Sequence, residues 1–189
     1  MRAWRLTILA AGALTMAAAP ADAAWKNYVS HKLGVVFAAP GEMKTSSGES
    51  RGAYSGPQET MIFSSAENNI QYRLTVTNYQ QAKAYSATIL GEAEFMFQEG
   101  KRVVSTTFGR IGSGKDMNYG RKIAIELPGK KGRTAGAFYF ANGYLFEFEA
   151  TVLPAAGNPD SPDAERFLNS IGFDAQAAKA GAAELSLPE

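Results

Sequence analysis

The chain has 189 residues, of which 46% are hydrophobic, 19 are basic and 18 are acidic, and it contains no cysteine. A net charge this close to zero argues against a nucleic-acid partner and against binding to a strongly anionic surface. Without cysteine there can be no disulfide, so the fold must be held by its hydrophobic core, and the length suits a single domain with such a core.

The N-terminal residues are predicted to be an export signal. Arg2 and Arg5 form a positive region, an apolar run covers residues 6–19, and Ala21 and Ala23 are the small residues of a cleavage site. The run is shorter than the roughly 20 residues that span a bilayer, which disfavours a retained anchor. We therefore expect a periplasmic or secreted protein with no stable membrane insertion after cleavage.

Three segments follow from this prediction. We expect a signal peptide at residues 1–23, a single α+β domain at residues 24–174, and a flexible Ala-rich tail at residues 175–189, which offers only Leu185 and Leu187 for burial. Removal of the signal peptide leaves equal numbers of basic and acidic side chains.

The first part of the predicted domain alternates short strands with turns. Strands are predicted twice within residues 25–40, then at residues 60–64 and 70–77. The last of these alternates cleanly between apolar and polar side chains after the turn at Asn68-Asn69. The polar run at residues 46–50 is expected to be a loop or a hairpin tip.

The period then changes to that of a helix over residues 82–99. Tyr85, Ile89, Ala93, Met96 and Phe97 recur at helical spacing, and a glycine follows at position 100, where a helix C-cap is expected. Further strands are predicted at residues 103–108 and 118–127.

Residues 133–154 are predicted to form one β-hairpin. Asn142-Gly143 suits a two-residue turn, because both positions need positive φ. That turn places Tyr139 opposite Phe146 and Ala137 opposite Phe148, with small residues facing large ones.

The last predicted helix begins after Ser161, a suitable N-cap, with proline at the first helical position. Ala164, Phe167, Leu168 and Ile171 form one apolar stripe, and Gly172 is expected to end the helix. Together the elements predict an α+β fold, a largely antiparallel β-sheet flanked by helices in an α/β/α sandwich.

Three local patterns resemble the PsbP-like fold. They are Trp25-x-x-Tyr28 leading into GVVFAAPG at residues 34–41, the long late hairpin, and RFLNSIGF at residues 166–173. The family includes an extrinsic photosystem II subunit, bacterial secreted relatives and a eukaryotic Ran-binding transport factor. The resemblance implies a fold with binding or assembly roles rather than catalysis, and it transfers no ligand residue to this chain.

A glycine-rich stretch at residues 109–116 matches the phosphate-loop pattern G-x-x-x-x-G-K through Lys115. The next residue should be Ser or Thr to hold Mg²⁺ and is Asp116, and a strand pattern follows where a helix is required. We expect a hairpin tip that binds no nucleotide.

Catalytic and metal sites find little support in the sequence. His31 is the only histidine, so a zinc site or a Ser-His-Asp triad would depend on it alone, and no serine lies in a G-x-S-x-G context. We expect His31 to lie at the surface or at a strand end. No cofactor and no metal site is predicted.

Seven residues make up the predicted partner surface. Glu147 and Glu149 share one face of a strand, where carboxylates can serve acid–base chemistry or a hard cation, although such residues more commonly face solvent. The others are Lys130, Lys131 and Arg133 of a basic turn that could meet an acidic partner, and Phe138 and Phe140.

Three functions remain open on these observations. The favoured one is a non-catalytic binding or assembly module with an envelope protein as its partner. The second is a carboxylate-based hydrolase that uses Glu147 and Glu149. The third is a carrier of a small apolar or amphipathic ligand in a cleft between sheet and helix, lined by Phe138, Phe140 and Leu145 if no helix fills that face.

Overall fold

The computed structural model describes residues 24–52, 56–81, 85–112, 114–174, 176 and 180–188. The predicted signal peptide lies outside these residues. In chain order the described elements are β1 (Trp25–Ser30), β2 (Val35–Pro40), β3 (Lys44–Gly52), β4 (Gly56–Glu67), β5 (Ile70–Asn78), α1 (Ser86–Gln98), β6 (Arg102–Ile111), β7 (Asn118–Glu126), β8 (Arg133–Ala141), β9 (Tyr144–Val152), α2 (Pro162–Asn169) and β10 (Ala183–Glu184).

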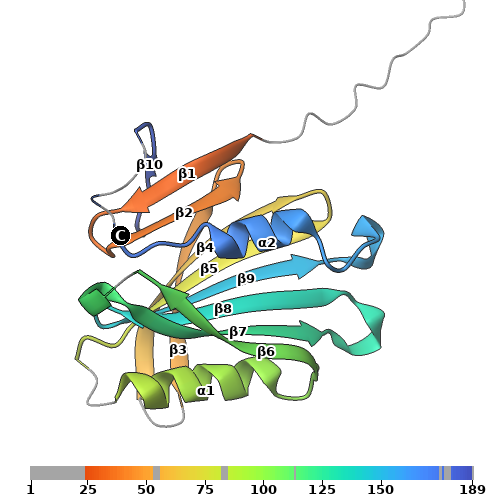
Figure 1. Ribbon diagram of the computed structural model, residues 1–189, viewed down its shortest axis with the longest axis horizontal. Coiled ribbons are helices and arrows are strands. Elements are labelled where there is room, and N and C mark those ends of the chain that lie inside the picture. Colours follow the sequence, from red (N-terminus) through yellow and green to blue (C-terminus); the bar gives the residue numbers. More distant parts are fainter. Residues whose placement is uncertain are drawn as a thin grey trace, which may run out of the picture.

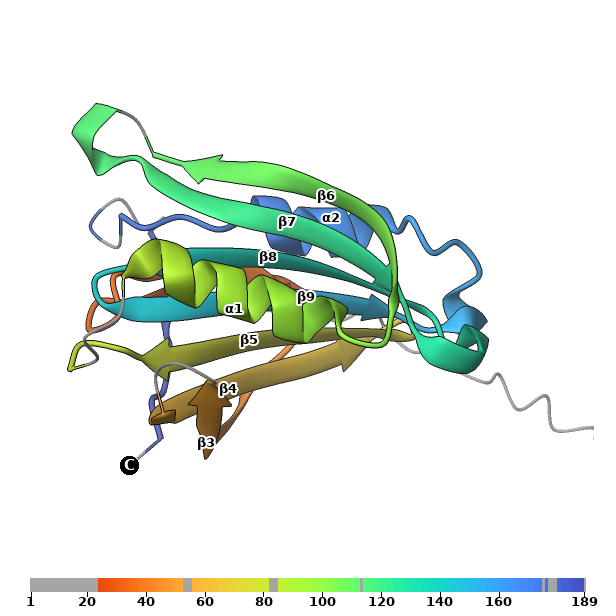
Figure 2. The same ribbon diagram turned by 90° about the horizontal axis from the view of Figure 1, so that it is seen from below.

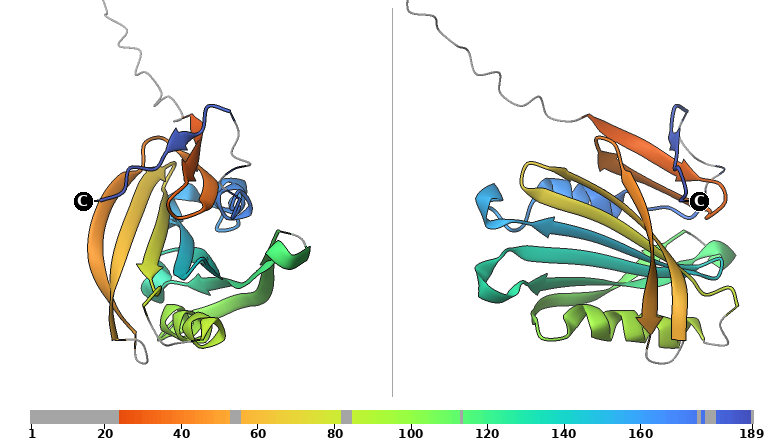
Figure 3. Two further views of the ribbon diagram at one scale, coloured as in Figure 1. Left: turned by 90° about the vertical axis from the view of Figure 1, so that its left-hand side faces the viewer. Right: turned by 180° about the vertical axis from the view of Figure 1, so that it is seen from behind.

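A seven-stranded sheet in the order β3-β4-β5-β9-β8-β7-β6 forms the centre of the molecule, and all its neighbouring strands are antiparallel. Helices α1 and α2 lie on its opposite faces, and the small sheet β10-β1-β2 lies on the side of α2 (Figures 1, 2 and 3). The predicted α+β fold, a largely antiparallel sheet between helices, is therefore confirmed.

Each face of the sheet has its own hydrophobic core. On the α2 side, Phe148 of β9 packs with Phe37 of β2 and Phe167 of α2. On the α1 side, Phe97 packs edge-on against Phe138 of β8, with the ring centroids 4.9 Å apart. Strand β8 thus contributes to both cores, which explains why both of its faces are apolar.

The late hairpin forms as predicted. Tyr139 pairs with Phe146 and Ala137 with Phe148, and the turn residues Asn142 and Gly143 have φ values of 53° and 79°. Both lie in the left-handed region that Asn and Gly adopt most easily.

The segments behind the family resemblance pack against one another. Trp25 lies edge-on to Tyr72, and the guanidinium of Arg166 lies 4.1 Å from the Trp25 ring centroid. Val36 and Gly172 exchange two backbone hydrogen bonds, each of 2.9 Å, which fasten the end of the α2 segment to β2. These motifs therefore hold the α2 layer on the sheet.

Three details differ from the sequence predictions. Residues 46–50 belong to strand β3, because an edge strand can pair through its backbone without an apolar face. Helix α2 ends at Asn169, so Ile171 is buried beyond the helix and Gly172 pairs with β2. Met96 on α1 and Tyr85 at its N-cap are exposed, whereas Leu90 of α1 is buried in the core.

The C-terminal segment also departs from its prediction. Strand β10 pairs in parallel with β1, and Leu185 is buried in the α2-side core. The prediction of a flexible tail is therefore wrong for residues 183–185. Leu185 packs in a core formed by residues far away in the sequence, so the residues around it give no sign of its burial.

Candidate functional site

Helix α1 covers only part of its face of the sheet. It packs on β7 and β8, and strands β5 and β4 lie beside it (Figure 2). Two adjoining cavities of about 520 and 340 Å³ occupy this position, and both are lined by Arg73, Leu127, Thr134 and Glu149. We call this hollow the polar trough and define it by Arg73, Thr75, Thr134, Glu147, Glu149 and Thr151.

Strand register brings these side chains together. Alternation along β9 places Glu147 and Glu149 on the α1 side, and the antiparallel pairing sets them opposite Thr75 and Arg73 of β5. Both carboxylates were expected to face open solvent. They are partly covered, because the sheet continues on both sides of β9 and the end of α1 adds a wall.

One of the two carboxylates has a partner of opposite charge. The Arg73 guanidinium donates a hydrogen bond of 2.7 Å from Nη2 to Oε1 of Glu149. The Glu149 side chain is 16% exposed and that of Arg73 is 52% exposed, so the pair lies at the edge of the trough. Across it, the hydroxyls of Thr134 and Thr151 share a hydrogen bond of 2.9 Å.

The other carboxylate, Glu147, has no such partner. Within the described part of the chain no hydrogen bond or ion pair to it is found, and its half-buried side chain lines the 340 Å³ cavity. Burial raises the pKa of Glu147 to about 7, and repulsion by Glu149 adds to the shift, while attraction by Arg73 opposes it. A carboxyl group that titrates near neutrality in a cavity is a feature of functional sites.

The apolar cleft that the carrier hypothesis requires, lined by Phe138, Phe140 and Leu145 if no helix fills that face, does not form, because α1 fills that position. Phe138 is completely buried under Phe97, and Leu145 belongs to the same core. Phe140 is half-buried, with its ring centroid 6.4 Å from that of Tyr79. Phe138 is thus a core residue, and its assignment to a partner surface is wrong.

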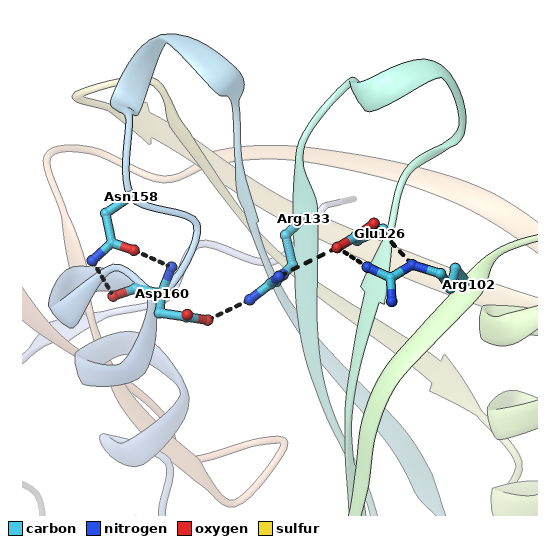
Figure 4. A network of polar contacts seen from close by, with 5 residues as sticks. All are labelled: Arg102, Glu126, Arg133, Asn158 and Asp160. Atoms are coloured by element: carbon cyan, nitrogen blue, oxygen red, sulfur yellow. Dashed lines mark hydrogen bonds and ion pairs between the residues drawn. The ribbon is translucent and has the colours of Figure 1, made fainter.

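Of the three residues in the basic turn, Arg133 belongs to a network of polar contacts, whereas the two lysines are exposed (Figure 4). Arg133 bonds Asp160 at 2.6 Å and Glu126 at 3.4 Å, and Glu126 also pairs with Arg102. This network ties the β7–β8 end to the loop before α2, where Asn158 holds Asp160. Lys130 and Lys131 remain exposed beside it.

The glycine-rich stretch and His31 lie where the sequence placed them. Gly114–Asp116 form a single 3-10 turn, and strand β7 follows it where a phosphate loop would be followed by an α-helix. His31 lies in the exposed β1–β2 turn, with its Nδ1 2.7 Å from Oε2 of Glu184. Among the described residues, no group of three or more His, Asp or Glu side chains is arranged to hold a metal ion.

Sequence reasoning found the carboxylates of the trough but missed Arg73, Thr75, Thr134 and Thr151. The polar alternation of residues 70–77 was visible, yet its partner strand was not. Strands β5 and β9 are far apart in the sequence, and only their pairing in the sheet shows that Arg73 faces Glu149.

No family model matches the chain, and neither does any curated protein. Among solved structures, the chain is similar to the solution structure of cyanobacterial PsbP (CyanoP) from Synechocystis sp. PCC 6803, with 11% sequence identity and a TM-score of 0.47. The match covers 85% of this chain and 98% of that one. The likeness concerns the fold alone.

None of the helices in the described part of the chain is long and apolar enough to cross a bilayer.

Proposed function

We propose that this protein is an exported, non-catalytic binding module and that the polar trough is its binding site. One observation carries the proposal: Glu147 lies at a cavity without a hydrogen-bond or ion-pair partner among the described residues. A polar group in such a place is costly unless something satisfies it, so a ligand that does so gains affinity.

The surroundings of Glu147 support binding. Arg73, Glu149 and the Thr134–Thr151 pair present charges and hydroxyls, and the apolar side chains of Ile125 and Leu127 exclude water nearby. Ligand sites typically combine such apolar walls with a few fixed polar groups. The predicted export signal at residues 1–23 supports a partner in the cell envelope.

Two tyrosine substitutions test this proposal. Ser64 lines the 520 Å³ cavity, so Ser64→Tyr should fill it. Ser47→Tyr is the control, because Ser47 is exposed on the neighbouring strand β3 and faces the other side of the sheet: its register partner Met61 packs against the α2-side core. The wild type and both variants are captured from the envelope fraction, and co-eluting proteins and small molecules are quantified by mass spectrometry.

We expect at least one species to co-elute with the wild type and with Ser47→Tyr and to be depleted at least tenfold, as an order of magnitude, with Ser64→Tyr. The same co-eluting species in equal amounts from all three proteins would contradict the assignment of the trough as the binding site, and so would their complete absence.

A further inference from the structure

We propose that the trough binds the primary alkylammonium group of its ligand, with the ammonium against Glu147 and the alkyl chain in the adjoining 340 Å³ cavity. This inference rests on the proposed function and names the chemical class that the site selects.

The charges at the trough favour a cation beside Glu147. Two carboxylates share one face of β9, and Arg73, the one guanidinium among the described residues that bonds either of them, is directed at Glu149. The next cation, Lys101, donates from Nζ to the carbonyl oxygen of Phe97 at 2.7 Å and lies over that residue's ring. It is thus held at the end of α1, and Glu147 has no cation of its own among the described residues.

A compact ammonium suits this position better than a guanidinium. The ammonium of an alkylamine has three donors on one atom, and Glu147, Glu149 and Thr75 line the same cavity and offer oxygen acceptors from the paired strands β9 and β5. A guanidinium binds best to a planar, bidentate acceptor. Arg73 already places a guanidinium on this face, where it bonds Glu149.

The walls of the cavity suit an aliphatic chain. Ile62, Met96, Phe97, Ile125 and Leu127 line the space above Glu147. Met96 is a partly exposed hydrophobic side chain that lines this cavity, so contact with an alkyl chain would remove its apolar surface from water. The cavity has room for an alkylammonium of the size of a lysine side chain.

Binding of an ammonium must displace the proton that Glu147 holds at low pH. The titratable and charged groups that face it in the cavity are Arg73 and Glu149 on the sheet and Lys101 after α1. Because the pKa of Glu147 is raised to about 7 while an alkylammonium keeps its charge to about pH 10, affinity should rise with pH as Glu147 loses its proton and level off above its pKa. From pH 5.5 to pH 8.5 the expected gain is on the order of thirtyfold.

The test is a titration of the purified protein, followed by ¹H–¹⁵N NMR shifts, at pH 5.5 and pH 8.5. The probes are n-butylammonium for a free amine and Nα-acetyl-lysine methylamide for a peptide-borne one, with n-butanol and CaCl₂ as controls. We expect saturable shifts around Glu147 and Thr75 with at least one amine, and the comparison of the two amines shows which source is preferred.

The Glu147→Gln variant should weaken amine binding at pH 8.5 by on the order of tenfold or more, because it keeps the shape of the side chain and removes its charge. Glu59→Gln, an exposed carboxylate on β4, is the matched control and should bind like the wild type.

The inference is overturned if neither amine binds, if n-butanol binds equally well, if only calcium produces the shifts, or if affinity does not depend on pH. Failure of the amines combined with loss of captured species in Ser64→Tyr would overturn the ligand class and leave the binding function standing.

Discussion

Replacement of Phe148 by alanine is expected to lower the free energy of unfolding by about 3–5 kcal/mol. The side chain is completely buried, and its ring centroid lies 5.6 Å from that of Phe37 and 5.7 Å from that of Phe167. These three rings join β9, β2 and α2, so the substitution leaves a cavity where three elements meet. Such a cavity cannot collapse without moving one of the layers.

The control for this prediction is Phe95→Ala on α1, where the side chain is 65% exposed. Ordinary surface substitutions change stability by no more than about 0.5 kcal/mol, and we expect the same here. Urea denaturation of the two variants measures both effects. Equal losses would show that the α2-side core has been assigned wrongly.

The second expected result is that Glu147→Gln stabilises the protein in a pH-dependent way. The folded protein holds a proton on Glu147 up to about pH 7, whereas the unfolded chain loses it at the ordinary value of 4.5. Between these values the folded state binds more protons, so the contribution of Glu147 to stability falls as pH rises. The glutamine variant has no such loss, and its advantage over the wild type should grow by roughly 2–3 kcal/mol from pH 4.5 to pH 8.

Denaturant melts of the wild type and Glu147→Gln at a series of pH values give this difference directly. Glu59→Gln corrects for the removal of one negative charge from the protein. A constant difference between Glu147→Gln and the wild type across this range would mean that Glu147 is not buried as the structure has it.

Local patterns predicted most of the fold because each depends on nearby residues. The turn at Asn142-Gly143 specifies the β8–β9 register by its length, and Ser161 caps α2 by accepting a hydrogen bond of 3.3 Å from the backbone of Asp163. Strand β3 escaped prediction because its pairing with β4 uses backbone groups that every sequence has. Strand β10 escaped because its partner β1 lies at the other end of the chain.

The candidate site was predicted only in part for the same reason. Glu147 and Glu149 were recognised as a same-face pair, since alternation along one strand is a local property. Their burial depends on α1, which packs over β8, and on Arg73 of β5, which is far away in the sequence. The sequence pattern alone suggested two solvent-facing carboxylates. In the fold, Glu149 is paired with Arg73, and Glu147 has no hydrogen-bond or ion-pair partner among the described residues.

The measurement that most directly tests the binding site is a pH titration of the Glu147 side-chain carboxyl carbon by ¹³C NMR, assigned through Glu147→Gln. Its midpoint reports whether this carboxyl group lies unpaired in a cavity, which is the observation on which the proposed function depends. The structure predicts a midpoint at about pH 7. A midpoint near the ordinary value of 4.5 would contradict it.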